Sequence, residues 1–409
     1  MSVSAMPGAP APAIDPLLRF RPQFPILGRS TYLVSNSLGA MPEATRQRLA
    51  DYAAIWDDIG VKAWAKEWWT MPVRVGDGLA PLMGAPAGSV AMIPNVSIAQ
   101  ASILSAIPFA PGRDEIIMSG LDFPSTRYVT EQLGPRFGAR VTVVPPSADG
   151  LSLDEERLIA AITDRTALVA ISHVLFRSAY IVDAAPVIAR AKQVGALVAL
   201  DAYHSVGVMP VDVTALGCDF LTGGVLKWLC GGPGGSFLYV APDVSTRLAP
   251  SFTGWQAHRA PFAFADEMDY ADGAWRWLSG TPPVPALYAA IEGPRIIAEA
   301  GLGAIREKSM RQTARLIALA DARGYRVHAP RNATRRGGTV AFDVPHGYEV
   351  AQALLARDIV IDYREGAGIR VAPHFYTSDD ELERAVAAID EILATGEWQR
   401  FAGRRQTVT

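Results

Sequence analysis

Residues 166–201 of the 409-residue chain read TALVAISHVLFRSAYIVDAAPVIARAKQVGALVALD, and this stretch decides the fold class. Two apolar runs, residues 166–171 and 197–200, have the composition of strands that are buried on both faces. Between them, residues 183–195 carry aliphatic side chains at helical spacing and end on Gly195, a typical residue for a helix C-terminus. A strand, a helix and a second strand in this order predict a parallel sheet covered by helices.

The same alternation continues on both sides of this unit. Further strands are expected at residues 115–118, 140–144, 219–222 and 236–240. After about residue 285 the pattern changes to a long helical stretch over 284–322. It is followed by expected strands at 339–343, 358–362 and 368–371 and by expected helices at 348–356 and 379–395. The patterns predict a large α/β domain and a smaller C-terminal α+β domain.

Four segments are expected along the chain. Residues 1–20 are rich in Pro and Ala and are predicted to form a flexible N-terminal tail. Residues 21–85 are expected to pack on the small domain or on a partner subunit. The large domain is expected over 86–285, and a linking helix with the small domain over 286–409.

Composition and charge narrow the classes of partner. The net charge is −3, from 38 Lys and Arg against 41 Asp and Glu, so we expect no nucleic-acid partner. No apolar run approaches the roughly 20 residues that span a bilayer, and the N-terminus lacks the pattern of a secretory signal. Two cysteines, Cys218 and Cys230, provide no disulfide framework, which favours a reducing compartment. We expect a cytoplasmic protein with no membrane partner.

Three polar residues are expected at the carboxyl ends of the strands, where open α/β sheets bind their ligands. Asp201 ends the apolar run 197–200, and Lys227 follows the next expected strand. Ser97 stands where a helix beginning near residue 98 would have its N-cap, which is a favourable place for an anion. Each of these signals is weak alone, because such residues are usually caps or solvated side chains.

Together the three residues suit pyridoxal 5′-phosphate. A lysine amine can form the Schiff base with this cofactor, a carboxylate can keep its pyridine nitrogen protonated, and a helix N-terminus can take its phosphate. The six histidines show no metal-ligand spacing, so no metal is expected.

Two stretches carry a resemblance to a known family: DAYHSVGVMPVD at residues 201–212 and LKWLCGGPGG at 226–235. Together they resemble the class V branch of the fold-type I pyridoxal-phosphate enzymes, and within it kynureninase. Seven shorter matches follow in family order: NSLG at 36–39, RVGD at 74–77, FPS at 123–125, FRS at 176–178, GW at 254–255, PFAF at 261–264 and SGTPP at 279–283. The resemblance implies an α/β fold with a mainly parallel, seven-stranded sheet in the large domain.

The resemblance also implies roles for individual residues. Lys227 matches the lysine of the Schiff base and Asp201 the partner of the pyridine nitrogen, and these two are the catalytic candidates. The implied cofactor-binding residues are Val96, Ser97, Phe123, Ser125, Thr126, Ser172, Asp201, His204, Lys227, Trp255 and Thr281. In the family, residues matching Trp255 and Thr281 typically come from the neighbouring subunit, so a homodimer with shared active sites is expected. Arg370 and Asn36 match substrate-binding positions, with Arg370 gripping the α-carboxylate.

Three departures from the family pattern affect the expected chemistry. Leu226 stands where kynureninases usually have a tyrosine that contacts the phosphate and is thought to help proton transfer. Thr126 stands where the family motif Phe-Pro-Thr-Asp usually has its Asp, so a carboxylate near the cofactor is missing. The Asp-Gly that often precedes NSLG is Val34-Ser35 here. The first departure predicts that kynurenine is cleaved poorly.

The implied function is a pyridoxal-phosphate-dependent enzyme acting on an α-amino acid, with kynureninase-like hydrolase or lyase chemistry at a Cβ–Cγ bond. A class V aminotransferase, a β-eliminating lyase and an epimerase remain alternatives. A cysteine desulfurase is disfavoured, because no cysteine follows Cys230. A non-catalytic cofactor-binding protein is an alternative from another class, against which the joint presence of Lys227, Asp201 and Arg370 argues.

Overall fold

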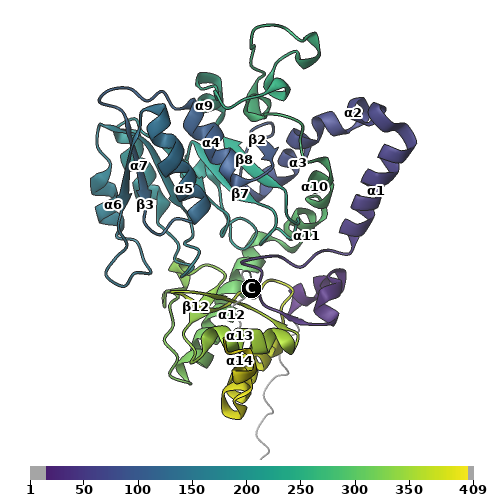
Figure 1. The fold of residues 1–409 in the computed structure, drawn as a ribbon, viewed down its shortest axis with the longest axis vertical. Coiled ribbons are helices and arrows are strands. Elements are labelled where there is room, and N and C mark those ends of the chain that lie inside the picture. The colour runs from purple at the N-terminus through teal and green to yellow at the C-terminus, as the bar shows by residue number, and fades with distance from the viewer. Residues whose placement is uncertain (1–14, 404–409) are drawn as a thin grey trace, which may run out of the picture.

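A computed structural model describes residues 15–403 of the chain. A seven-stranded sheet forms the centre of the larger part of the molecule (Figure 1). Its strands, in spatial order, are β2 (Val90–Ile93), β8 (Ser236–Val240), β7 (Phe220–Gly224), β6 (Leu197–Asp201), β5 (Thr166–Ser172), β3 (Glu115–Ser119) and β4 (Arg140–Val144). β8 pairs antiparallel with β2 and with β7, and all other strand pairs in this sheet are parallel. The mainly parallel sheet is therefore confirmed, with β2 added as a strand that the sequence patterns did not predict.

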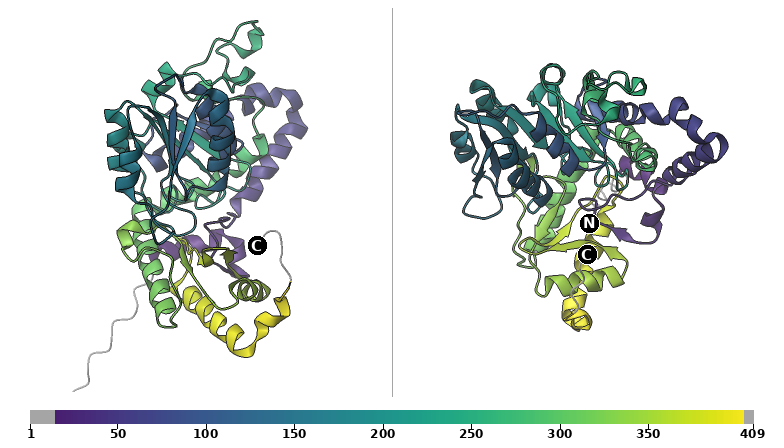
Figure 2. Two further views of the ribbon diagram at one scale, coloured as in Figure 1. Left: turned by 60° about the vertical axis from the view of Figure 1, so that its left-hand side comes forward. Right: turned by 45° about the horizontal axis from the view of Figure 1, so that its top comes forward.

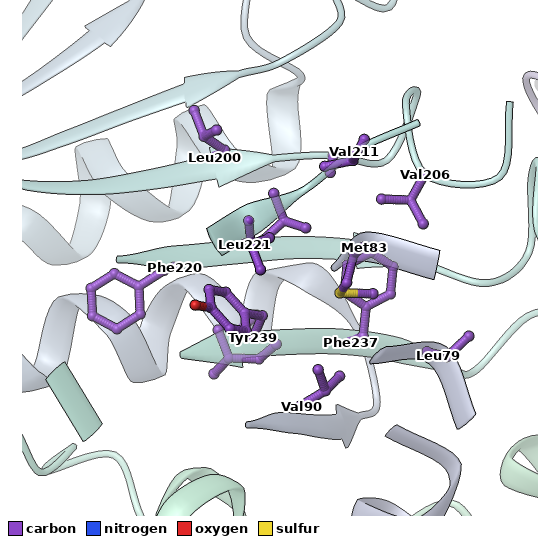
Figure 3. Close-up of a cluster of buried hydrophobic side chains, with 14 of the residues drawn as sticks. Leu79, Met83, Val90, Leu200, Val206, Val211, Phe220, Leu221, Phe237 and Tyr239 are labelled. Carbon is purple, nitrogen blue, oxygen red and sulfur yellow. The ribbon is translucent and has the colours of Figure 1, made fainter. Parts of the chain in front are cut away.

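Apolar strands and apolar helix faces make the core of this part. The helices along it are α3 (Met71–Leu79), α4 (Val96–Ala106), α5 (Pro124–Leu133), α6 (Glu155–Ala161), α7 (Ala184–Gln193), α8 (Val213–Leu216) and α9 (Pro242–Arg247). Every residue of β5 is buried, as expected for a strand covered on both faces. Figure 3 shows side chains from β2, β6, β7 and β8 meeting Leu79 and Met83 in one apolar cluster.

The C-terminal part is built on a small antiparallel sheet with strand order β11-β12-β9. Its elements are α12 (Leu302–Asp321), β9 (Val340–Phe342), α13 (Gly347–Ala356), β10 (Ile359–Val360), β11 (Asp362–Arg364), β12 (Gly368–Val371) and α14 (Asp379–Thr395). The helix expected at 379–395 and the strand expected at 368–371 are confirmed.

Two expectations about this region are wrong in detail. The stretch 284–322 is three helices rather than one: α10 (Val284–Ala289), α11 (Glu292–Ala300) and α12. Gly301, with φ of +82°, ends α11, because the left-handed region is open to glycine and costs other residues energy. The strand expected at 358–362 is divided between β10 and β11, which pair in different sheets.

The N-terminal segment lies against the C-terminal part, as the two views of Figure 2 show. A 3₁₀-helix, η1 (Pro16–Gln23), precedes β1 (Thr31–Tyr32), which pairs parallel with β10. Phe20 and Phe24 each place their ring centroid 5.8 Å from that of Phe375. Residues 1–14 of the expected flexible tail lie outside the described residues. The rest of that expectation is wrong, because residues 16–20 are helical and Leu17 and Phe20 are buried.

Helix α1 (Ala44–Ile59) and the short α2 (Ala63–Lys66) form an arm at the side of the molecule (Figure 1). Thr45 is the buried side chain of α1, whereas Trp56 is exposed. Trp64 and Trp68 lie 5.4 Å apart in an edge-to-face arrangement, and Trp68 Nε1 donates to the Tyr288 hydroxyl at 3.3 Å. These tryptophans therefore serve packing of the arm against α10.

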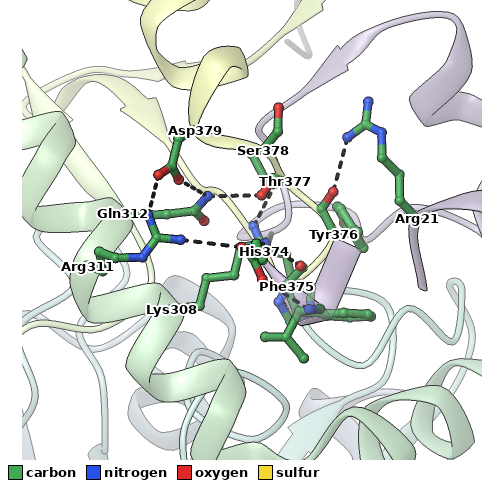
Figure 4. A network of polar contacts seen from close by, with 12 residues as sticks. Arg21, Lys308, Arg311, Gln312, His374, Phe375, Tyr376, Thr377, Ser378 and Asp379 are labelled. Atoms are coloured by element: carbon green, nitrogen blue, oxygen red, sulfur yellow. Dashed lines mark hydrogen bonds and ion pairs between the residues drawn. The ribbon is translucent and has the colours of Figure 1, made fainter. Parts of the chain in front are cut away.

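A polar network holds the loop that follows β12 (Figure 4). Gln312 on α12 donates to the Thr377 carbonyl at 2.9 Å and to Asp379 at 3.0 Å. The buried Lys308 amine donates to the Phe375 carbonyl at 2.6 Å, and Arg21 from η1 donates to the Tyr376 carbonyl at 3.0 Å. The loop is thus fixed from two sides.

Within residues 15–403, no helix is both long and apolar enough to cross a membrane. The same residues contain no group of three or more His, Cys, Asp or Glu side chains placed to hold a metal ion.

Candidate functional site

A cavity of about 240 Å³ opens at the carboxyl ends of the central strands. It brings together eight of the residues expected from the sequence: Val96, Ser97, Phe123, Ser125, Ser172, Asp201, His204 and Lys227. Five further lining residues are Asn95, Val174, Phe176, Tyr203 and Leu226. Strand ends and helix beginnings thus converge on one site, as the parallel arrangement predicts.

Lys227 lies in the loop after β7 with its amine inside the cavity. Its Nζ is 2.8 Å from Nε2 of His204 and lies over the ring of Tyr203, 4.5 Å from the centroid. Burial lowers the pKa of Lys227 to about 7, although the Asp201 carboxylate opposes the shift. A lysine amine in this state has a large neutral fraction near pH 7, which is what a nucleophile or a general base requires.

The backbone beside Lys227 depends on a close approach by the NSLG segment. The Gly39 amide donates to the Leu226 carbonyl at 2.8 Å. A Cβ placed on Gly39 would lie 2.2 Å from the Lys227 carbonyl oxygen, so this position has no room for a side chain. The glycine of the NSLG motif therefore shapes the lysine loop.

His204 is buried beside the Lys227 amine. Burial holds the pKa of His204 well below its ordinary value, and the nearby charges of Lys227 and Arg370 lower it further. A neutral imidazole offers one nitrogen as acceptor, so His204 can accept a hydrogen bond from the lysine. It therefore holds the amine in place without adding charge.

Asp201 ends β6 at the other side of the cavity and is 5% exposed. Its Oδ1 accepts from the Tyr203 amide at 2.9 Å, and its Oδ2 accepts from the Thr126 hydroxyl at 3.2 Å. Burial raises the pKa of Asp201, while these hydrogen bonds and Lys227 oppose the change. Thr126 therefore lies behind Asp201 and orients it, rather than lining the cavity.

The N-terminus of α4 faces the cavity with its first residues. Asn95 is the N-cap, since its side chain accepts from the Ile98 amide at 3.0 Å. The expected N-cap at Ser97 is therefore wrong by two residues, because an Asn side chain satisfies the first turn and lets the helix begin at Val96. Ser97 instead presents its hydroxyl and amide at the positive end of the helix dipole, where a phosphate would be stabilised.

Aromatic and aliphatic side chains form the remaining wall. The rings of Phe123 and Phe176 meet edge to face with centroids 5.2 Å apart. Val174 and Leu226 complete this apolar surface. An aromatic or aliphatic group therefore fits beside the Lys227 amine.

Asp122 is a buried carboxylate at the site that the sequence analysis missed. Its Oδ1 accepts from the Ser172 amide at 2.7 Å, and its Oδ2 accepts from the Ser119 amide at 2.8 Å. Burial, with a smaller contribution from Asp201, raises the pKa of Asp122 to about 7. The side chain ties the end of β3 to the end of β5 and so fixes the position of Ser172.

Two residues expected to bind substrate do not line the cavity. Arg370 is buried on β12, where its guanidinium pairs with Asp362 and donates to the Phe176 carbonyl at 2.8 Å. Asn36 is 1% exposed, and neither atom of its amide group has a hydrogen-bond partner among the described residues. Arg370 nevertheless lies close enough to influence the pKa of Lys227.

Trp255 and Thr281 lie apart from the cavity and are both exposed. Trp255 packs against Trp69 and Phe262. The expected cofactor contacts of these two residues are not made within one chain.

The cavity fits pyridoxal 5′-phosphate on the chemistry of its donors. A buried carboxylate, Asp201, the N-terminus of α4 and the Lys227 amine all line the same cavity. Phe123 offers a ring face to an electron-poor heterocycle.

Comparisons with known proteins agree with this chemistry. The family model described as aminotransferase class-V matches residues 95–376. Kynureninase from Burkholderia pseudomallei (strain K96243) is 34% identical over 407 residues, covering 95% of this chain and 96% of that protein. Kynureninase from Pseudomonas fluorescens is 32% identical over 399 residues, covering 94% of each.

Solved structures show the same fold at lower identity. A cysteine desulfurase from Thermococcus onnurineus NA1 superposes with a TM-score of 0.80 at 21% identity, covering 92% of this chain and 98% of that one. The cystine C-S lyase C-DES, in complex with cysteine persulfide, gives a TM-score of 0.80 at 20% identity and covers 90% of this chain and 99% of that one.

Proposed function

Because the chain belongs to the class V aminotransferase family, as a kynureninase-like, pyridoxal-phosphate-dependent enzyme, we propose that it hydrolyses the Cβ–Cγ bond of an α-amino acid with an aromatic keto side chain. The observation that carries this proposal is the 34% identity to a kynureninase over 95% of the chain. In such a reaction water adds across the bond that breaks. Kynurenine and water would give anthranilate and alanine.

The lining residues supply the functions that this reaction needs. The bound cofactor serves as an electron sink for charge that develops on the substrate. Lys227 would hold the cofactor covalently and, once released as a neutral amine, move a proton at the substrate Cα. Asp201 would keep a proton on the pyridine nitrogen, and Ser97 at the start of α4 would bind the phosphate.

The remaining lining residues would fix the cofactor and the side chain of the substrate. Phe123 would stack on the pyridine ring, and His204, Ser172 and Ser125 would make polar contacts around it. Phe176 and Leu226 would face the aromatic side chain. Arg370 would bind the α-carboxylate, for which a guanidinium has matching donors.

Leu226 decides the expected rate on kynurenine itself. The side chain of leucine has no titratable or hydrogen-bonding group, so it can neither donate a proton nor hydrogen-bond to a phosphate. We therefore propose that kynurenine is bound but cleaved slowly.

The direct test mixes purified holoprotein with L-kynurenine and 3-hydroxykynurenine and measures the aromatic acid and alanine released. Slow release of both products in equal amounts, which Leu226→Tyr accelerates, is the expected result. Transfer of the amino group to a keto acid without bond cleavage would overturn the proposal and indicate an aminotransferase.

Attachment of the cofactor to Lys227 has its own test. Borohydride reduction followed by peptide mapping should label Lys227, and Lys227→Ala should remove both the label and the visible absorption band. Lys192→Ala, which changes an exposed lysine, is the matched control. A label on any other lysine would contradict the assignment.

We also propose a cytoplasmic homodimer with shared active sites. The exposure of Trp255 and Thr281 away from their own cavity supports the dimer, and two free cysteines support a reducing compartment. Sedimentation should give a dimer. Inactive Lys227→Ala and inactive Trp255→Ala proteins, mixed and exchanged, should regain activity, since one site of the hybrid would be intact. No recovery in a proven hybrid would refute shared sites.

A further inference from the structure

Asp362 and Arg370 form a buried ion pair between neighbouring strands at the site. They face each other across β11 and β12, where the register pairs Asp362 directly with Arg370. Arg370 Nε lies 2.8 Å from Oδ1 and Nη2 lies 2.5 Å from Oδ2, so the contact is bidentate. Both side chains are almost fully buried, with 2% of the Asp362 side chain and 4% of the Arg370 side chain exposed.

The pairing leaves a defined set of donors on Arg370. A guanidinium has five N–H groups. Asp362 takes one from Nε and one from Nη2, and the Phe176 carbonyl takes one from Nη1. One N–H remains on each terminal nitrogen, which is the number that a carboxylate needs for a second bidentate contact.

The ion pair lies beside a second guanidinium and close to the cavity. Arg364 Nη2 lies 3.5 Å from Oδ2 of Asp362. The charges of Arg370 and Asp362 act in opposite directions on the pKa of Lys227, which places the pair close to the reacting amine. Phe176 connects the two, since its ring lines the cavity and its carbonyl contacts Arg370.

We propose that Asp362 is a positioning residue for substrate recognition: it occupies the Nε edge of Arg370 and presents the terminal edge to the substrate α-carboxylate. This inference rests on the proposed role of Arg370 in binding that carboxylate. It assigns Asp362 no contact with the substrate or the cofactor. Its effect must therefore pass entirely through Arg370.

The experiment compares two probes that differ only by a carboxylate, L-alanine and ethylamine. Their dissociation constants are measured with holoprotein from the change in the visible absorption band. The variants are Asp362→Asn, Asp362→Glu, Arg370→Gln and the double variant Asp362→Asn/Arg370→Gln. Asp390→Asn is the matched control, because Asp390 on α14 forms a bidentate pair with Arg323, which lies just after the end of α12.

Asp362→Asn should raise the dissociation constant of L-alanine about tenfold or more, because its amide group can accept from only one N–H and opposes the other. The value for ethylamine, the unliganded spectrum and the control variant should not change. Asp362→Glu should recover part of the affinity, since it restores the carboxylate. In the Arg370→Gln background, Asp362→Asn should have no further effect.

The outcomes separate this inference from the proposed function. If Arg370→Gln leaves the preference for L-alanine over ethylamine unchanged, the role of Arg370 fails and the inference with it. If Arg370→Gln removes that preference but Asp362→Asn and Asp362→Glu retain it, the inference alone fails. Equal weakening of both probes by Asp362→Asn would show a structural role only and would also refute it.

Discussion

Lys227, the lysine proposed to hold the cofactor, should destabilise the cofactor-free protein. Lys227 has a pKa of about 7 in the folded protein, mainly through burial, against 10.5 for an exposed lysine. Between pH 7 and 10.5, Lys227 is protonated in the unfolded chain but mostly neutral in the native state. Stability should therefore rise with pH across this window. Lys227→Met introduces an uncharged side chain of similar length, so it should remove the free-energy cost of burying the lysine.

The magnitude follows from the two pKa values. Since a tenfold change in an equilibrium constant is worth about 1.4 kcal/mol, the cost of burying the lysine is about 5 kcal/mol at low pH, about 4 at pH 7 and about 2 at pH 9. The substitution also removes the 2.8 Å contact with His204. Leaving a buried imidazole nitrogen unpaired costs about 1–3 kcal/mol. The net gain for Lys227→Met at pH 7 is thus about 2 kcal/mol.

The assay is urea unfolding of the cofactor-free proteins at pH 6, 7, 8 and 9, followed by tryptophan fluorescence and circular dichroism. The variant should be more stable at pH 6 and 7, and the difference should shrink towards zero by pH 9. Lys192→Met, at an exposed position, should show no such trend. A variant less stable than wild type at pH 7, or a difference independent of pH, would refute the reasoning.

Two further predictions concern the buried carboxylates Asp201 and Asp122. Asp201→Asn should leave the protein folded but reduce turnover by several orders of magnitude in a steady-state assay, because an amide cannot keep the pyridine nitrogen protonated. Asp122→Asn should weaken cofactor binding in an equilibrium titration, since its NH₂ would meet the amide of Ser119 or Ser172. Burial raises the pKa of Asp122 from 3.8 to about 7, so the native state binds a proton that the unfolded chain releases in this window. The free energy of unfolding of the wild type should therefore fall as pH rises from about 4 to 7. The free energy of unfolding of Asp122→Asn should not show this fall.

Local patterns predicted the strands that bear the site, because a strand buried on both faces is apolar throughout. β5 and β6, expected at 166–171 and 197–200, each run one residue further, to Ser172 and Asp201. The break at Gly301 was less visible, since the sequence on both sides keeps its helical spacing. The division into domains near residues 85 and 285 stays a prediction.

Site residues could be predicted where the chemistry depends on a single side chain. They could not be predicted where their role depends on a hydrogen-bond partner far away in the sequence. Lys227 and Asp201 could be placed at strand ends from the sequence, and the cavity contains both. Asp122 could not be found, because its partner Ser172 is 50 residues away and a contact with the amide of that residue leaves no local sequence pattern. The pairing of Asp362 with Arg370 depends on the register of a short hairpin, which no local pattern specifies.

The fold alone does not decide between desulfurase and kynureninase chemistry, since the cysteine desulfurase superposes with a TM-score of 0.80. The side chains around Lys227 do discriminate. Sulfur transfer by a protein thiol requires a reactive thiolate, yet both cysteines are buried, and burial raises the pKa of Cys230 to about 12. The cavity wall next to the lysine is instead formed by Phe176, Val174 and Leu226. The cavity on this shared fold is therefore suited to a substrate with an aromatic or aliphatic side chain.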